Sequence, residues 1–454
     1  MRAFPHFTTV LLAILTPACS LDQAGVDPVQ GTFNFPAEVA LSPALAADGA
    51  PAFLFVANAN FDLRYNGGTV MSLDAMRIAE AIRDPAMCPE SATAPCVLDP
   101  SVYEINEVRT GSFPGGMAVS TRGDRIYVPI RSDGNLTYID VDDSGRLSCV
   151  TNGTVPGNDA PPARCDDGHR RGDETIANQR GEAMPADPVR VITVPLTALD
   201  AAAPPDSGDA VIVADVAGAM SFFIDERAQN GSTAPQLIDV ISGLASGLAG
   251  LAYDPTSQLL YGTSTRSSEL ARVGVALDLQ AHDLRRSFLF KASSLFVGGL
   301  DDGRDTRDIH FDPANQMAYV LSRRPEVLLV ADMSATPRNN GELPVEQLIG
   351  VSAGPSRLTV ATIGGTQYAF ISCYDARTLY VIDLDLSREV GIIRGFSGPF
   401  QIAVDSVRNL LYVADFRGSN LRVVDLAPLT TPGADAALSV VAFVGTQRPR
   451  SELH

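Results

Sequence analysis

The feature that most constrains the fold of this chain is a unit of three short strands, Gly398–Leu426, with weaker copies along most of the sequence. The unit reads GPFQIAVDSVRNLLYVADFRGSNLRVVDL, in which short apolar runs alternate with turns rich in Asp, Asn, Gly and Ser. Its run Leu410–Ala414 is continuously apolar, which is typical of a strand buried on both faces of its sheet. A small sheet of this kind needs neighbouring sheets to cover it, and repetition supplies them.

Seven copies of this unit can be aligned. Their second strands are Phe53–Ala57, Arg125–Val128, Ala210–Ala214, Leu259–Gly262, Met317–Val320, Tyr368–Ile371 and Leu410–Ala414. Four-stranded units repeating every 40–50 residues or so favour a closed propeller over an open solenoid. The sequence therefore predicts an all-β fold between residues 35 and 446, a seven-bladed β-propeller built from four-stranded antiparallel blades.

The repeats also resemble a known family. A Gly-Pro lead-in, an LYVA-type second strand and a VID-type third strand resemble the YVTN-type β-propeller repeat, clearest in the second, sixth and seventh copies. Tyr-Val-Ala-Asp at 412–415 and Tyr-Val-Pro-Ile at 127–130 stand where that family has Tyr-Val-Thr-Asn. The resemblance covers the region Phe35–Thr446 and implies a ring of seven blades.

Residues 1–18 have the features of an export signal. Positive charge at the start is followed by Phe7–Leu15, an apolar segment that is too short to span a bilayer. The segment resembles a bacterial lipoprotein signal, which implies that Cys19 is the lipidated first residue of the mature protein. It departs from that pattern at Thr16, and Thr16 with Ala18 fits ordinary signal cleavage equally well.

Residues 19–34 are polar and are expected to form a tether, and residues 447–454 a tail. Ser20, after the cysteine, points to the outer membrane of a Gram-negative cell. The lipoprotein resemblance therefore implies a cell-envelope location, on the outer membrane, with membrane contact through the lipid anchor only. Ordinary cleavage would instead give a periplasmic or secreted protein.

Four further cysteines lie in loop insertions, which favours two local disulfides. Cys88 and Cys96 bracket a Pro-rich segment, and Cys149 and Cys165 bracket a longer segment rich in Gly and Pro. Three pairings of the four are possible, and the local pairing costs the least loop-closure entropy. Such disulfides agree with export. Cys373 follows a strand and is expected to be an inert core thiol.

The insertions Arg77–Asp99 and Val150–Ala186 interrupt the first two blades. Ala75–Arg83 has the best helical pattern of the chain. Val150–Ala186 shows no strand pattern and is predicted to be a surface loop. Each copy contains its own strands, so the closure of the ring stays open, and Thr32–Phe35 is a candidate for a strand added to the last blade.

Several kinds of chemistry have no signal in this sequence. A net charge of −19 repels phosphate backbones, so nucleic acid is not an expected partner. No pair of histidines has zinc spacing, and no hydrolase or nucleotide-binding motif stands in its structural context. Asp140–Gly145 matches the opening of a calcium loop, for which a polar turn is the simpler interpretation. We therefore expect no cofactor and no metal.

The mouth of a propeller's central channel is the first place to look for a site, because the innermost strands begin there. The alignment places five polar candidates among small residues at these positions: Arg190, Asp308, His310, Arg357 and Gln401. They predict a polar pocket for an anionic or hydroxylated ligand. The alternative is a solvated channel lined by internal ion pairs.

The hairpins between second and third strands lie on the same rim and carry arginines, of which the rim candidates are Arg131, Arg324, Arg377 and Arg417. Guanidinium groups suit planar recognition of carboxylates and phosphates. The alternative is ordinary solubilising charge, because arginines also fall on the opposite rim.

The leading hypothesis is a monomeric, non-enzymatic binding or scaffold module whose channel-mouth rim takes a protein or a small anionic ligand. The alternative is a propeller enzyme of lactonase or lyase type acting at the same mouth. That alternative rests on fold analogy, and Asp308 with His310 is the nearest approach to a catalytic couple in the sequence.

Overall fold

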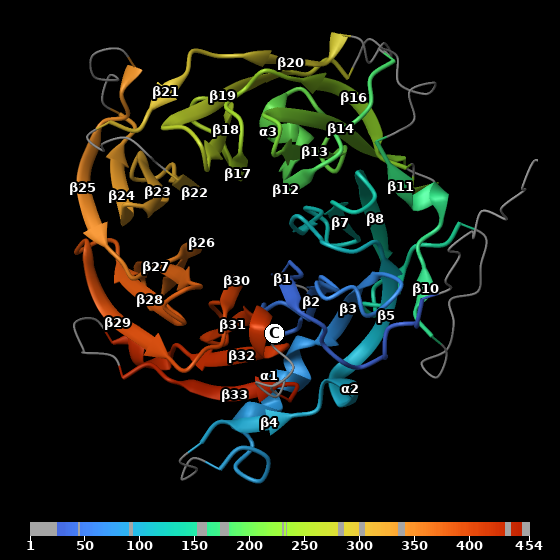
Figure 1. Cartoon of the computed structure of the whole chain (residues 1–454), viewed down its shortest axis with the longest axis vertical. Coiled ribbons are helices and arrows are strands. Elements are labelled where there is room, and N and C mark those ends of the chain that lie inside the picture. The colour runs from blue at the N-terminus through green and yellow to red at the C-terminus, as the bar shows by residue number, and fades with distance from the viewer. Residues whose placement is uncertain are drawn as a thin grey trace, which may run out of the picture.

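The computed structural model describes residues 25–43, 46–89, 94–151, 161–172, 181–228, 231–232, 234–279, 286–298, 305–334, 341–431 and 437–446. The predicted signal segment, Cys19 and the predicted tail 447–454 lie outside the described residues. The strands form seven sheets arranged in a ring, which Figure 1 shows face-on. The predicted seven-bladed β-propeller of four-stranded antiparallel blades is confirmed.

In each blade the first strand lies nearest the ring axis and the last strand lies at the outside (Figure 1). The four main strands are β1 (Pro36–Leu41), β2 (Phe53–Asn58), β3 (Gly68–Asp74) and β5 (Glu104–Thr110) in blade one, and β6 (Ala118–Val119), β7 (Arg125–Ile130), β8 (Asn135–Val141) and β11 (Arg170–Arg171) in blade two. They are β12 (Pro188–Pro195), β13 (Gly208–Asp215), β14 (Ala219–Ala228) and β16 (Gln236–Ile241) in blade three, β17 (Leu248–Asp254), β18 (Leu259–Ser264), β19 (Glu269–Ala276) and β20 (Phe288–Lys291) in blade four, and β22 (Asp305–Asp312), β23 (Met317–Arg324), β24 (Glu326–Asp332) and β25 (Val345–Gly350) in blade five. They are β26 (Pro355–Ile363), β27 (Thr366–Cys373), β28 (Thr378–Asp383) and β29 (Arg388–Arg394) in blade six, and β30 (Pro399–Asp405), β31 (Leu410–Asp415), β32 (Asn420–Asp425) and β33 (Val440–Val444) in blade seven.

Blade seven illustrates how the repeat unit folds. β30 and β31 are antiparallel, with Asp405 opposite Leu410, and the turn between them reverses at Asn409, whose φ of 55° is a left-handed conformation that asparagine tolerates. On β31, Tyr412 packs toward blade one and Val413 toward blade six, and neither is exposed. The continuous apolar run therefore reflects sheets covered on both faces.

The ring is closed by an insertion rather than by the N-terminus. β4 (Cys96–Leu98), from the insertion in blade one, pairs in parallel with β33 and gives blade seven a fifth strand. The expectation that Thr32–Phe35 adds this strand is wrong. Phe35 contacts blade seven through its N–H, which donates to Ser419 Oγ (3.3 Å), and through its ring, which packs on Phe416.

The expectation that Val150–Ala186 is a loop without strands is also wrong. β10 (Ala163–Arg164) pairs in parallel with β5 of blade one, and β11 is the outer strand of blade two. Both are two-residue strands at sheet edges, which are too short to leave a periodic pattern and form because a neighbouring edge is unpaired. β10 and β11 lie at the outside of the ring (Figure 1).

Both predicted disulfides are present, Cys88–Cys96 and Cys149–Cys165, and Cys373 is a free, buried thiol whose pKa burial raises to about 12. The predicted helix α1 (Ala75–Arg83) forms, with Asp74 accepting from the Arg77 N–H at its start. Two shorter helices are α2 (Pro100–Tyr103) and α3 (Leu196–Leu199). No helix among the described residues is both long and apolar enough to cross a membrane.

Candidate functional site

A cavity of about 430 Å³ lies at the end of the ring where the innermost strands begin, and we call it the mouth. Its charged lining residues are Glu38, Arg131, Arg307, Arg323, Arg357 and Asp375. Residues of all seven blades line it, from Glu38 in blade one to Phe400 in blade seven. The volume falls within the range of about 300–1,000 Å³ that is typical of small-ligand sites.

Five polar side chains from five blades form a connected group, which we call the axial network: Glu38, Arg190, Asp308, Arg357 and Gln401. Arg190 donates to Asp308 Oδ2 (3.2 Å), and Arg357 Nε donates to Gln401 Oε1 (3.1 Å). Gln401 Oε1 also lies 3.5 Å from Arg190, which joins the two pairs. Arg357 completes the group with an ion pair to Glu38 at 3.6 Å. Glu38 and Arg357 also line the mouth, so the network adjoins the cavity.

Glu38 and Asp308 are buried and the other three members are partly buried, which shifts the ionisation of Glu38 and Arg357. Burial raises the pKa of Glu38, against the attraction of Arg357 and Arg190. Burial also lowers the pKa of Arg357 to about 10, with repulsion from Arg190 acting in the same direction. Arg357 therefore remains a cation at neutral pH, held by Glu38 and Gln401 and placed 4.4 Å from the centre of the Phe400 ring.

Asp308 is fully engaged in holding the strands together. Its Oδ2 accepts from the Leu358 N–H of blade six (3.1 Å) as well as from Arg190, and its Oδ1 accepts from the Ile309 N–H (3.2 Å). His310 does not join this group. Burial lowers the pKa of His310, its ring stacks on Tyr319, and the described residues give that ring no hydrogen bond. Asp308 and His310, the nearest approach to a catalytic couple in the sequence, therefore do not hydrogen-bond to each other in the described structure.

The predicted rim arginines separate into two groups. Arg131 lines the mouth and pairs with Asp187 at 2.6 Å. Arg417 lies 4.8 Å from the ring centre of Tyr374, a residue of the mouth, and donates to the Tyr374 hydroxyl (3.0 Å). Arg324, at the end of β23, and Arg377, in a turn with φ of 58°, are not among the residues that line the mouth.

Two arginines outside the predicted set line the mouth. Arg323, next to the predicted Arg324, pairs with Asp375 at 2.5 Å, and Arg307 pairs with Asp305 at 2.6 Å. The pairing register of β22 with β23 shifts on both sides of Thr306. A prediction that side chains alternate strictly between the two faces of this strand therefore points Arg307 away from the mouth, which it in fact lines. Arg323 could have been predicted as a mouth residue because it stands next to the predicted Arg324 in the same hairpin.

Beside the mouth lies a chain of six rings in mutual contact, which we call the aromatic arc: Phe35, Phe61, Phe113, Tyr374, Phe400 and Phe416. Phe61 is 57% exposed, and Leu63 beside it is 63% exposed. Phe35 and Phe113 have φ of 54° and 60°, a strained conformation for bulky residues that is concentrated at binding and active sites.

The fold is similar to several solved propellers. The candidate 6-phosphogluconolactonases of Bacteroides fragilis (TM-score 0.55, 12% identity, 87% of this chain and 96% of that chain) and Bacteroides uniformis (0.54, 14%, 87% and 97%) are two of them. Kuenenia stuttgartiensis hydrazine synthase is a third, with TM-score 0.51 and 11% identity over 90% of this chain and 99% of that chain. At these identities the similarity shows the fold alone. The chain matches no protein-family model and no curated protein.

Proposed function

We propose that this protein is an exported, monomeric binding module that takes an acidic ligand, a small anion or an acidic segment of a partner protein, at the mouth. The observation that carries the proposal is that four arginines line one cavity against two acidic residues. Each arginine also has an ion-pair partner, and two of these partners, Asp187 and Asp305, lie outside the lining. In a chain of net charge −19, such a cavity is a local site of attraction for anions within a repulsive background.

The ion pairs of Arg131 and Arg323 leave these two arginines available to a ligand. Arg131 and Asp187 are 44% and 45% exposed, and Arg323 is 29% exposed. Exposed pairs contribute roughly 0–1 kcal/mol each, so an incoming carboxylate or phosphate can replace the internal partner at little cost. Several such contacts in a concave, partly desolvated cavity add up to useful affinity.

The axial network supports this surface from below. Its members are held by partners from other blades, so Arg357 is presented to the cavity in one orientation. A binding group that is fixed in advance loses less conformational entropy when the ligand arrives. The aromatic arc extends the site with an apolar surface for the uncharged part of the ligand or partner.

We further propose that export occurs through the lipoprotein route, with Cys19 as the lipidated residue and the outer membrane as the location. Support comes from the N-terminal sequence and from the two disulfides, which are characteristic of oxidising compartments. Mass spectrometry of the membrane fraction tests this route. An acylated Cys19 is expected, and membrane retention that survives Cys19→Ala would contradict it.

The binding proposal is tested by calorimetric titration of the full chain with citrate and inorganic phosphate, with glycerol as an uncharged control. At low ionic strength the two anions are expected to bind and glycerol is not. The affinity should fall as salt rises to about 0.15 M, where the Debye length is about 8 Å. Anion binding that ignores salt would contradict an arginine-lined site.

A second candidate function is a lactonase. The observation in its favour is Glu38, a buried carboxyl with a raised pKa that lines the mouth beside Arg357, as a general acid or base requires. Two of the structural neighbours are candidate 6-phosphogluconolactonases. Hydrolysis of 6-phosphogluconolactone by the wild type, but not by Glu38→Gln, would favour this function over binding alone.

A further inference from the structure

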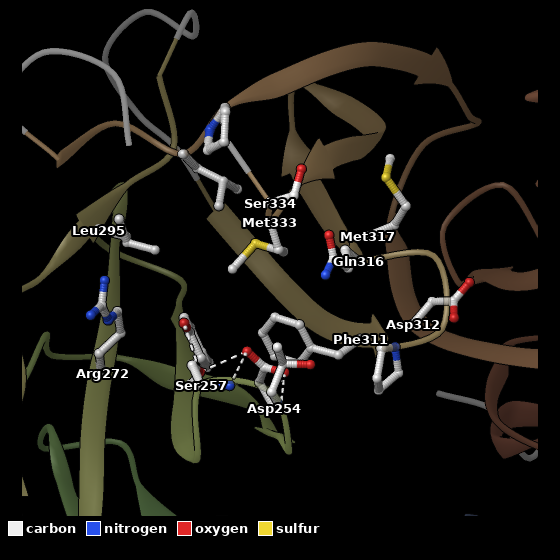
Figure 2. A pocket seen from close by; sticks show the side chains of 15 residues that line it. Asp254, Ser257, Arg272, Leu295, Phe311, Asp312, Gln316, Met317, Met333 and Ser334 are labelled. Carbon is white, nitrogen blue, oxygen red and sulfur yellow. Dashed lines mark hydrogen bonds between the residues drawn. The ribbon is translucent and has the colours of Figure 1, made fainter. Parts of the chain in front are cut away.

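A second cavity, of about 380 Å³, lies between blades four and five. Two turns that join first and second strands border it, residues 254–258 and 312–316, so it opens on the rim opposite the mouth. Figure 2 shows these turns with the side chains that line the cavity. None of its lining residues belongs to the mouth or to the axial network. It is therefore a separate candidate site.

The walls of this cavity are mostly apolar and come from both blades. Tyr261, Leu295, Phe311 and Leu343 are buried and belong to one hydrophobic cluster between the blades. The outer wall is fixed because the Leu343 N–H donates to the carbonyl of Phe296, 2.7 Å away, across the blade boundary. A shape held by backbone hydrogen bonds is present before any ligand arrives.

One cationic side chain enters this apolar cavity from the side of blade four. Arg272 lies on β19 with its guanidinium carbon 5.8 Å from the centre of the Tyr261 ring. Among the described residues it has no ion pair and no side-chain hydrogen bond, and its Nε is shielded from solvent without an acceptor. A half-buried guanidinium without an anion is unfavourable, and a bidentate carboxylate supplies what is missing.

The two carboxylates in the cavity are held in their own turns. Asp254 accepts from the Thr256 N–H (2.9 Å) and the Ser257 hydroxyl (2.6 Å), which Figure 2 shows as dashed lines. Asp312 accepts from the Ala314 N–H (3.1 Å) and the Asn315 side-chain amide (2.7 Å). Both groups therefore stabilise turns, and neither forms an ion pair with Arg272 in the described structure.

We propose that this cavity binds a small monocarboxylate with a flat, apolar body. The carboxylate pairs with Arg272, and the body lies against Phe311 with Met317 and Met333 beside it. Methionine side chains adapt their shape and make favourable contacts with aromatic rings, which suits a planar ligand. Discrimination from neutral analogues comes from the single charge on Arg272.

The test uses the full chain and 2-naphthoate as the probe, titrated by calorimetry, with 2-naphthamide and 2-naphthylmethylamine as the neutral and cationic analogues. The titrations are made at about 0.15 M salt, where screening weakens anion binding at the exposed mouth more than at the partly buried Arg272. Under these conditions we expect saturable binding of one naphthoate per chain and no comparable binding of the analogues. Arg272→Gln should weaken naphthoate binding about tenfold or more, because a charge-assisted hydrogen-bond pair is lost, and Arg272→Lys should weaken it less. Met333→Trp, which fills the cavity and leaves Arg272 in place, should also abolish binding.

Arg131→Gln/Arg323→Gln at the mouth is the matched control and should leave naphthoate binding unchanged. The proposal is overturned if the amide or the amine binds as well as naphthoate, or if no probe binds at millimolar concentration. Unchanged affinity in correctly folded Arg272→Gln, or loss of binding in the mouth variant only, would equally overturn it. Because the two sites share no residue, failure here leaves the proposed function of the mouth standing.

Discussion

Arg190 of blade three and Asp308 of blade five meet at 3.2 Å although blade four lies between them in the ring. Gly250 stands at the matching place in blade four, and a Cβ there would lie 2.7 Å from the Asp308 Cα. The glycine therefore allows the innermost strands of blades four and five to approach closely beside this ion pair.

Substitution of this glycine should destabilise the fold. In Gly250→Ala the added methyl group meets backbone atoms of Asp308 and Arg307, at 2.7 and 2.9 Å, which cannot rotate away. We expect a loss of about 1–3 kcal/mol in the free energy of unfolding, measured by urea denaturation. Gly350→Ala is the control, because no atom lies within 4 Å of the added Cβ. Equal effects of the two substitutions would contradict the close approach.

The pH dependence of stability should report a second buried carboxyl, Glu107 on β5, which is 5% exposed. Burial raises the pKa of Glu107 from 4.5 to about 8, with Glu104 acting in the same direction. The folded protein therefore keeps a proton that the unfolded chain releases above its pKa. The stabilising contribution is complete below about pH 4.5 and is lost as pH rises toward 8.

Glu107→Gln removes this titration, so its stability relative to the wild type should increase steadily between about pH 5 and pH 8. Urea denaturation at several pH values in this range measures the difference. Glu346→Gln, a substitution at an exposed position of β25, is the control and should show no such trend. A difference between Glu107→Gln and the wild type that stays constant with pH would refute the raised pKa.

The disulfide Cys88–Cys96 should stabilise the closure of the ring, because Cys96 is the first residue of β4. We expect Cys88→Ser/Cys96→Ser to lower the free energy of unfolding by about 2–3 kcal/mol. Without the disulfide the unfolded chain is no longer restricted by a short closed loop, so its conformational entropy is higher. Thermal denaturation under non-reducing conditions measures this loss. An unchanged melting temperature would show that β4 holds to β33 without the disulfide.

The fold was predictable because its signal is repeated. Runs such as Leu410–Ala414 recur in seven copies, and each copy supports the same interpretation of the others. The closing strand β4 was not predictable, because it has three residues and its partner β33 lies hundreds of residues away. Local patterns carry no information on such a pairing.

The sequence predicted which residues converge at the candidate site better than it predicted the contacts that these residues make. Alignment of the strand starts brought Arg190, Asp308, Arg357 and Gln401 to one place, because equivalent positions of a propeller converge on its axis. The bulge in β22 placed Arg307 in the mouth against the expected alternation. His310 lies on the same strand but is half-buried and stacks on Tyr319, a contact between neighbouring strands that spacing alone did not reveal.

Calorimetric titration of citrate into Arg131→Gln/Arg323→Gln measures whether the mouth binds acidic ligands through its arginines. Arg122→Gln/Arg388→Gln is the matched control with the same charge change. Arg122 lies in the turn before β7 and Arg388 at the start of β29, both on the rim opposite the mouth. We expect the mouth variant to lose about tenfold or more in affinity at low salt while the control retains wild-type binding. Equal affinities in the two variants would contradict this expectation.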